Sequence, residues 1–476
     1  MVFSSIPFVF FFLVLSLILY YIVPFEFKGF KAKNFVLMIF SLIFYAWGEP
    51  IYISLMFFSS IVDYTNGQMI KKYYDNKKMK TIFLIISILI NLGLLGFFKY
   101  SDFLIINLNN LLGLSIEPLN LGLPIGISFF TFQTMSYSID VYRGDVKAED
   151  DFLTFMTYVC MFPQLIAGPI VRYETVAEEL SEREINFEHY CTGLVRFLIG
   201  LFKKVLIANQ VGRLWSIVSV LPTSELSVLT SWLGILAFSL QIYFDFSGYS
   251  DMAIGMGKML GFNYLENFNY PYISKSITEF WRRWHMSLST FFRDYVYIPL
   301  GGSRCSTLLN IRNIAVVWAL TGLWHGADWN FILWGVYFGT LLIVEKFVLN
   351  KWLKKLPSFL QHTYALILIV IGWMIFSSCD MATPIEYALS MIGINSTLVN
   401  EKALFFLSEY GTILLIGMIL STPIYPTFKK KFNELENKTL ANIITVLMVI
   451  AFIILLIITV SYLVSDTFNP FLYFRF

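Results

Sequence analysis

Histidine, cysteine and charged residues are all scarce in this chain. Only four histidines and four cysteines occur among 476 residues, and Asp, Glu, Lys and Arg together make up 14%. Cys160, Cys191, Cys305 and Cys379 lie far apart, with no CxxC pair and no histidine at metal-ligand spacing. We therefore expect neither a disulfide framework nor a metal site. The net charge of +2, without a basic run interleaved with aromatics, argues against a nucleic-acid partner.

Apolar residues are correspondingly abundant. They make up 57% of the chain, well above the share in a soluble globular domain. Long apolar runs alternate with charged loops, which is the pattern of successive membrane crossings. The sequence therefore predicts an all-α polytopic protein of the cell membrane, with the lipid bilayer around it and roughly ten or eleven crossings.

The first apolar runs are followed by lysines. Residues 6–23 approach the about 20 helical residues that span a bilayer, and neither a preceding basic residue nor a following cleavage site indicates a signal peptide. Residues 34–62 are broken at 48–50, which predicts a two-helix hairpin. Because lysines favour the cytoplasmic side, the N-terminus and the hairpin turn are expected outside. The flanking lysines are Lys28, Lys31, Lys33, Lys71, Lys72, Lys77, Lys78 and Lys80.

The middle of the chain is less regular. Residues 81–98 are expected to cross, residues 103–114 are too short and too polar to cross, and residues 121–139 are expected to return. Residues 152–170 contain FPQLIAGPI, whose prolines and glycine break a helix, so a re-entrant or broken segment is expected. Residues 172–189 form a charged helical pattern that predicts a cytoplasmic surface segment.

Residues 190–215 are apolar but interrupted by basic side chains, which predicts a helix along the membrane interface. The interrupting residues are Arg196, Lys203, Lys204 and Arg213. Four later runs, 331–349, 364–376, 404–420 and 440–463, lead alternately into lysine-rich and lysine-free loops. This alternation fits single crossings and predicts an extracytoplasmic C-terminus. We divide the single membrane-embedded domain into N-terminal helices 1–120, a core 121–345 and C-terminal helices 346–476.

Two histidines lie in the aromatic-rich core. His285 belongs to WRRWHMSLSTFFRDYVYIPLGGSR, and His325 belongs to GLWHGADWNF, where Gly326 is a helix-stop signal. If residues 331–349 run inward, residues 313–324 rise from the inner side, and twelve helical residues rise about 18 Å. This places His325 near or beyond the bilayer midplane. Polar residues after His285 cannot cross lipid, so an interfacial or re-entrant element open to the inner side is expected.

Each of these residues also has a structural interpretation. A lone histidine among aromatic residues is commonly a hydrogen-bonded packing residue, although membrane depth makes such a residue costly and favours a functional role. Arg282 and Arg283 can extend to lipid phosphates, and the neighbouring tryptophans can form an interfacial belt. The sequence alone leaves both interpretations open.

These motifs, together with FPQLIAGPIVR and QIYFDFSGYSDMAIG, resemble the membrane-bound O-acyltransferase family. The resemblance extends over residues 121–339 and is strongest to the alginate O-acetylation branch, which acylates exported polysaccharides and peptidoglycan. It implies a ring of helices around a central tunnel that joins a cytoplasmic acyl donor to an extracytoplasmic acceptor. It also implies that His325 is the principal catalytic residue and that His285 assists it.

The function implied is O-acyl transfer, most simply of acetyl, from a cytoplasmic thioester to hydroxyls of an extracytoplasmic polysaccharide. The donor expected is acetyl-CoA, without a bound cofactor. Short outer loops offer no groove for a polymer, which predicts a separate partner. The resemblance implies that this partner is an extracytoplasmic serine hydrolase-like acetyltransferase or a polymer-synthase complex. Alternatives are D-alanyl transfer from a carrier protein to teichoic acid, lipid acylation, a transporter without acyl chemistry, and a membrane scaffold.

The chemistry assigns roles to further residues. A neutral imidazole suits general-base catalysis on a hydroxyl near neutral pH, and burial keeps the ring neutral. Guanidinium groups suit the phosphates of a coenzyme donor. The candidate donor-binding residues are Trp281, Arg282, Arg283, Arg293 and Arg304. The candidate tunnel-lining residues are Gln133, Gln164, Trp324, Asp328 and Asn330.

Overall fold

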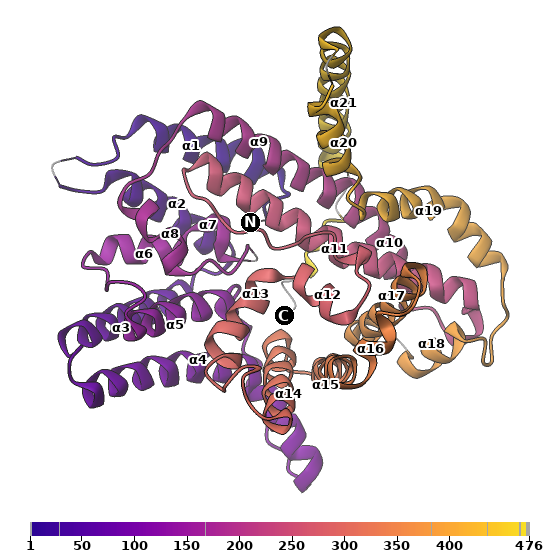
Figure 1. The fold of residues 1–476 in the computed structure, drawn as a ribbon, viewed down its shortest axis with the longest axis horizontal. Coiled ribbons are helices and arrows are strands. Elements are labelled where there is room, and N and C mark those ends of the chain that lie inside the picture. The colour runs from indigo at the N-terminus through magenta and orange to yellow at the C-terminus, as the bar shows by residue number, and fades with distance from the viewer. Residues whose placement is uncertain are drawn as a thin grey trace. The chain divides into compact units, whose positions relative to one another are not determined.

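The structure is a computed structural model that describes residues 2–27, 29–166, 168–381, 383–435, 437–465 and 468–472. Across these ranges the chain is helical (Figure 1), and apart from two isolated bridges the described residues form no strand. The all-α prediction is therefore confirmed. Lys28, which contributed to the predicted orientation, lies outside the described residues.

The chain forms two compact units. Unit 1 comprises Met1–Phe197 and Tyr249–Glu266, and unit 2 comprises Leu198–Gly248 and Asn267–Phe476. Both candidate histidines belong to unit 2. The division into 1–120, 121–345 and 346–476 remains a prediction.

Unit 1 contains the N-terminal helices. The predicted hairpin break is confirmed, because α2 ends at Gly48 and α3 begins at Ile53. The predicted break in residues 152–170 is also confirmed, because the chain divides there into α6 and α7. The helices are η1 (Pro7–Phe12), α1 (Leu13–Ile22), α2 (Ala32–Gly48), α3 (Ile53–Lys72), α4 (Lys77–Leu112), α5 (Ile127–Arg143), α6 (Phe152–Cys160), α7 (Phe162–Leu165) and α8 (Tyr173–Ser181).

Helix α4 corrects one expectation. The sequence predicts residues 81–98 and 103–114 as separate segments, but a single 36-residue helix contains nearly all of both. The asparagines do not interrupt it, since Asn107 donates from its side-chain amide to the carbonyl of Phe103 at 2.7 Å. Asp102 accepts hydrogen bonds from the N–H groups of Leu119 and Asn120 and so ties the following loop to the helix.

Two other boundaries differ from the sequence prediction. Helix α5 begins at Ile127 rather than near residue 121, after Gly126 with a φ of +77°. The charged segment 172–189 is not one helix, because α8 ends at Ser181 and α9 (Phe187–Phe202) begins after an extended stretch. Helix α9 and helix α11 (Val228–Met259) each contribute residues to both units.

Unit 2 contains the helices that carry the histidines and the C-terminal helices (Figure 1). They are η2 (Lys203–Ala208), α10 (Asn209–Val218), η3 (Thr223–Glu225), η4 (Pro271–Ile273), α12 (Ile277–Arg283), α13 (Met286–Phe292), η5 (Arg293–Tyr297), α14 (Thr307–His325), α15 (Trp329–Val344), η6 (Glu345–Leu349), α16 (Asn350–Leu353), α17 (Ser358–Phe376), η7 (Ser378–Asp380), α18 (Pro384–Met391), α19 (Glu401–Leu420), α20 (Ile424–Asn433) and α21 (Lys438–Ser465).

Six helices in the described part of the chain are long and apolar enough to cross a membrane. They are Lys77–Leu112, Val228–Met259, Trp329–Leu353, Ser358–Phe376, Glu401–Leu420 and Lys438–Ser465. Two shorter apolar helices, Pro7–Ile22 and Ala32–Gly48, accompany them. The chain is thus a multi-pass membrane protein. The expected number of ten or eleven crossings is not confirmed, and the tunnel and the positions of the termini remain predictions.

Ion pairs account for two of the four basic residues that predict an interfacial helix at 190–215. Within unit 1, Arg196 lies 2.6 Å from a carboxylate oxygen of Asp251 and 2.7 Å from one of Glu266. Within unit 2, Lys204 lies 2.7 Å from Asp245. Because these cations have acidic partners inside the protein, their presence does not require a position at the membrane interface.

Candidate functional site

His325 is the last residue of α14, as the helix-stop signal predicts. The φ of Gly326 is −174°, a backbone conformation that any residue can adopt. A glycine is needed because of space, since an added Cβ would lie 2.2 Å from the ring of Phe331. Gly322, one turn earlier, lets α14 approach α15, because a Cβ there would lie 2.6 Å from the carbonyl oxygen of Phe331. These two glycines fix the end of α14 closely against α15.

The proton on His325 has a defined position. Its Nδ1 lies 2.7 Å from the carbonyl oxygen of Thr321. A carbonyl oxygen only accepts hydrogen bonds, so Nδ1 of the neutral ring carries the proton and Nε2 carries the lone pair. The side chain is 4% exposed. His325 is therefore a buried imidazole whose Nε2 can act as a base.

Aromatic rings surround His325. The ring of Trp334 packs edge-on at 4.8 Å between centroids, and the rings of Trp324 and Phe376 lie at 5.0 and 5.7 Å. Asn330, in the first turn of α15, donates from its side-chain amide to the carbonyl of Phe376 at 2.8 Å and so joins α15 to the end of α17. This enclosure limits water around the imidazole and holds the ring in one orientation.

His285 lies in a strained turn between α12 and α13. Its φ and ψ of 44° and 55° are left-handed, a conformation that costs a residue other than glycine about 1–3 kcal/mol. Two main-chain hydrogen bonds hold the turn, from Met286 N–H to the carbonyl of Asn267 and from Asn269 N–H to the carbonyl of Arg283, both at 2.9 Å. Such strain is typical of functional sites.

Asn267 defines the proton position on His285. Its side-chain oxygen accepts from the N–H of Ser287 at 3.2 Å and from the hydroxyl of Ser287 at 2.9 Å. Because a main-chain N–H only donates, the amide oxygen faces this turn, and Nδ1 of His285, 3.1 Å away, donates to it. His285 is then also an imidazole with the lone pair on Nε2. Sequence reasoning missed Asn267, because no motif spacing distinguishes it.

The indole of Trp324 lies close to both imidazoles. Its centroid is 5.0 Å from that of His325 and 5.8 Å from that of His285. On the other side, Phe246 packs edge-on against His285 at 4.7 Å. His285 lies outside the six candidate spans, and burial lowers its pKa well below the usual value. Repulsion between the protonated forms of His285 and His325 lowers this pKa further. The structure thus brings the two predicted histidines and Trp324 together.

The predicted donor-binding arginines differ in availability. Arg282, Arg293 and Arg304 have exposed side chains, although Arg293 pairs with Asp294 at 2.6 Å. Arg283 is engaged more fully, since it pairs with Glu279 at 2.9 Å and donates to the carbonyl of Asn269 at 3.1 Å. Their role towards a donor remains a prediction.

Trp281 lies inside an aromatic cluster of unit 2. Its ring centroid is 4.8 Å from that of Trp318, 4.9 Å from that of Phe338 and 5.4 Å from that of Trp334. These contacts favour packing behind the wall of the His325 site over direct contact with a donor.

The other predicted tunnel-lining residues fall in different places. Asp328 is exposed and caps α15 by accepting from the N–H of Trp329 at 2.5 Å. Gln133 and Gln164 belong to unit 1, where both are fully buried. The side-chain amide of Gln164 donates to the carbonyl of Tyr158 at 2.7 Å, while that of Gln133 has no hydrogen-bond partner among the described residues. A buried, unsatisfied amide suits a polar ligand or water, and tunnel lining remains a prediction for these residues.

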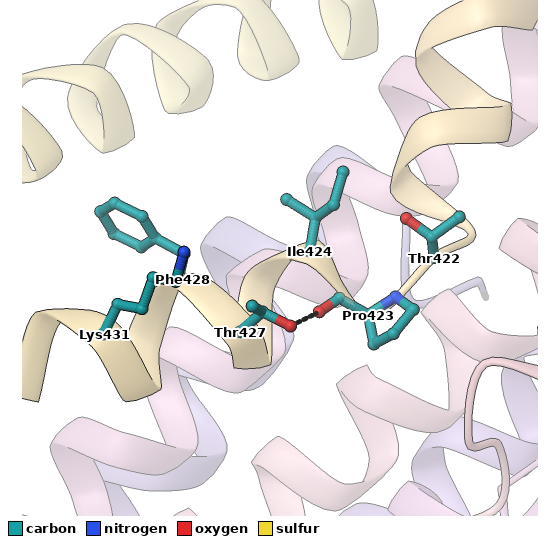
Figure 2. A pocket seen from close by; sticks show the side chains of 6 residues that line it. All are labelled: Thr422, Pro423, Ile424, Thr427, Phe428 and Lys431. Carbon is teal, nitrogen blue, oxygen red and sulfur yellow. Dashed lines mark hydrogen bonds between the residues drawn. The ribbon is translucent and has the colours of Figure 1, made fainter.

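A cavity of about 440 Å³ lies elsewhere in unit 2, at the turn between α19 and α20 (Figure 2). It is lined by Thr422, Pro423, Ile424, Thr427, Phe428 and Lys431. The hydroxyl of Thr427 is already bonded to the carbonyl of Pro423 at 2.7 Å. Lys431 is the only titratable side chain among these lining residues, with no histidine or carboxylate beside it, so the histidines remain the candidate site.

A multi-pass helical protein with two buried imidazoles among aromatic rings, each with its lone pair on Nε2, fits the class of membrane-embedded enzymes that move protons during group transfer. Residues 146–382 match the family described as MBOAT, membrane-bound O-acyltransferase. The chain belongs to this family, and it is an O-acyltransferase.

Full-length relatives agree with this assignment. The "Probable alginate O-acetylase AlgI" of Azotobacter vinelandii is 37% identical and aligns over 100% of both chains. A protein with the same name from Pseudomonas aeruginosa is 39% identical over 88% of this chain and 81% of its own. The "Peptidoglycan O-acetyltransferase" of Helicobacter pylori is 34% identical over 90% of this chain and 87% of its own.

Proposed function

We propose that this protein transfers an acetyl group from a cytoplasmic thioester, most simply acetyl-CoA, towards hydroxyls of an extracytoplasmic polysaccharide. The names of its full-length relatives, which are O-acetylases of alginate and peptidoglycan, support the acetyl group and the polymer class. The observation that carries the proposal is the hydrogen bond from Nδ1 of His325 to the carbonyl of Thr321, because it leaves Nε2 as the base.

The reaction follows from that geometry. Nε2 of His325 removes the proton of an acceptor hydroxyl while the oxygen of that hydroxyl attacks the carbonyl carbon of the thioester. The tetrahedral intermediate then expels the thiolate, which takes the proton from the imidazolium, so that an ester and a thiol are formed. A thioester already has a good leaving group, so the base and the position of the hydroxyl are the main requirements.

His285 has a related but separate role. A histidine that assists His325 could hold the thioester or polarise its carbonyl, yet polarisation by a neutral ring requires an N–H directed at the carbonyl. Because Nδ1 of His285 donates to Asn267, its Nε2 is an acceptor. We therefore assign His285 to holding the donor, by accepting a hydrogen bond from an amide N–H of a pantetheine arm or from the acceptor hydroxyl.

The donor assignment has a direct test. Acetyl-CoA carries phosphates that suit the exposed guanidinium groups of Arg282, Arg293 and Arg304. Purified protein should bind labelled acetyl-CoA and release free coenzyme A when an acceptor is present. Absence of both binding and transfer, together with transfer from an acylated carrier protein, would replace acetyl-CoA by the carrier protein as the donor.

We also propose an extracytoplasmic partner, a serine hydrolase-like acetyltransferase or a polymer-synthase complex, that receives the acetyl group. The described helices are joined by short segments, and a hydrated polymer needs a groove to be ordered. The purified protein alone, given acetyl-CoA and soluble polysaccharide, should acetylate the polymer poorly. Efficient polymer acetylation without a second protein would show that this chain is the complete transferase.

A further inference from the structure

Unit 2 contains a buried ion pair away from the histidines. Nζ of Lys204 in η2 lies 2.7 Å from Oδ1 of Asp245 in α11, and the two side chains are only 3% and 2% exposed. Burying two charges costs several kcal/mol each, and their attraction offsets this only where further hydrogen bonds complete the geometry. The partners that complete it identify what the pair does.

The remaining partners of this ion pair come from residues 468–472, here called the tail segment. Lys204 donates a second hydrogen bond to the carbonyl of Pro470, and the N–H of Leu472 donates to Oδ2 of Asp245 at 3.0 Å. In a third contact, the side-chain amide of Asn209 in α10 donates to the side-chain oxygen of Asn469 at 3.2 Å. Each charge of the pair thus binds the other charge and the main chain of the tail segment.

The tail segment packs into the core that surrounds the candidate site. Leu472 is 6% exposed and belongs to the same hydrophobic core as Trp334 and Phe376, whose rings contact His325. Asp245 directly precedes Phe246, whose ring packs on His285. The ion pair and the tail segment therefore lie within one packed body with both imidazoles.

We propose that Lys204 and Asp245 are positioning residues, which hold the tail segment in the core of unit 2 and thereby fix the histidines for transfer. This inference rests on the proposed transferase function. The competing explanation is that the two charges only neutralise each other in an apolar helix packing. The two explanations differ for a variant that removes both charges together.

The central variant is the double substitution Lys204→Met with Asp245→Asn, which leaves no lone buried charge but removes the bonds from Lys204 to Pro470 and weakens the bond from Leu472. A Leu472→Cys substitution introduces a thiol, here called the reporter thiol, that measures whether the tail segment stays buried. The background has Cys191, Cys305 and Cys379 changed to serine and the buried Cys160 kept. We expect the double variant to reach the membrane, the reporter thiol to become reactive to a soluble thiol reagent, and transfer to fall by up to about 10²-fold.

The Arg196–Asp251 pair provides the matched control. It is also an ion pair to α11, at 2.6 Å, but it belongs to unit 1 and lies outside the contacts of the tail segment described above. Asp251→Asn should leave the reporter thiol protected. Lys204→Arg should retain more protection and more transfer than the double variant, because the guanidinium keeps the charge and the donors although it is larger.

The outcomes separate the proposals. A protected reporter thiol with normal transfer in the double variant would show that the pair only neutralises charge. A reactive reporter thiol with normal transfer would show that the tail segment is held but is not needed for the reaction. If the reporter protein with the intact ion pair protects its reporter thiol but transfers no acetyl group from acetyl-CoA, the proposed function fails while the tail contact stands.

Discussion

Nδ1 of His325 donates a hydrogen bond to the carbonyl oxygen of Thr321 at 2.7 Å, one turn earlier in α14. A helix carbonyl near the end of α14 thus decides which nitrogen of the neutral imidazole keeps the lone pair and can act as a base. The chemistry of the site therefore depends on this hydrogen bond, which His325 makes as the last residue of α14 while its ring contacts Trp334. This dependence leads to the first prediction.

Replacing His325 by alanine should lower acetyl transfer by about 10² to 10⁴, which is the usual contribution of a general base. The measurement is surface-polysaccharide acetylation at equal membrane abundance. His362→Ala is the matched control, because His362 also places Nδ1 near a carbonyl oxygen, that of Ser274 at 3.2 Å, but is only partly buried in α17. Wild-type acetylation in the His325 variant would show that another group is the base.

Asn267→Ala should reduce transfer by about tenfold, since it removes the acceptor that orients His285 and leaves buried donors unsatisfied at about 1–3 kcal/mol each. The steady-state rate of coenzyme A release measures this reduction in transfer. Asn269→Ala is the control, because Asn269 is exposed and its main chain makes the contacts to Arg283. Equal rates in both variants would show that the Asn267 contact is not needed for the reaction.

The lowered pKa of His285 predicts how stability depends on pH. Its usual pKa is about 6.5, and burial holds the folded value well below that. As pH falls below about 6.5, the unfolded chain takes up a proton that the folded chain refuses, so stability is lost towards acid and regained as pH rises. The unfolding temperature in detergent should decrease as the pH is lowered from 7.5 to 5. This decrease should be smaller for the His285→Gln variant. Identical pH slopes in the two proteins would contradict a depressed pKa.

Unit 1 has a polar centre that supports a stability prediction. Asp63 of α3 is fully buried and accepts from the Ser87 hydroxyl, from the amide of Asn91 at 2.7 Å and from the hydroxyl of Ser138 at 3.0 Å. Asp63→Ala should remove the acceptor of three hydrogen bonds from α4 and α5, at a cost of about 1–3 kcal/mol for each donor left unsatisfied, and sharply lower the yield of folded protein. Asp75→Ala changes an exposed residue and should leave the yield of folded protein unchanged. Size-exclusion chromatography of solubilised protein compares them, and equal yields would exclude this role for Asp63.

Some of this organisation follows from the sequence and some does not. The end of α14 at His325 could be predicted, because a glycine after an apolar run is a local signal. Helix α11 was missing from the predicted crossings, because Asp245 and Asp251 count as polar until their partners Lys204 and Arg196 are known. Asn267 could not be identified, since its bond to His285 exists only after the left-handed turn folds. Local signals such as a helix stop can be predicted from the sequence, whereas contacts between residues far apart in the chain cannot.

The predicted orientation of the C-terminal helices can be tested on two exposed residues. Lys430 lies in the basic helix α20, and Ser465 ends α21, a 28-residue apolar helix that begins at Lys438. A helix of that length extends about 42 Å, enough to cross the hydrocarbon core. With Cys191, Cys305 and Cys379 replaced by serine, a membrane-impermeant thiol reagent added to intact cells should label Ser465→Cys and not Lys430→Cys. Permeabilised cells should show labelling of both sites, which controls for reactivity. Labelling of both sites from outside intact cells would contradict the alternation of crossings, and with it the depth near or beyond the midplane that the sequence assigns to His325.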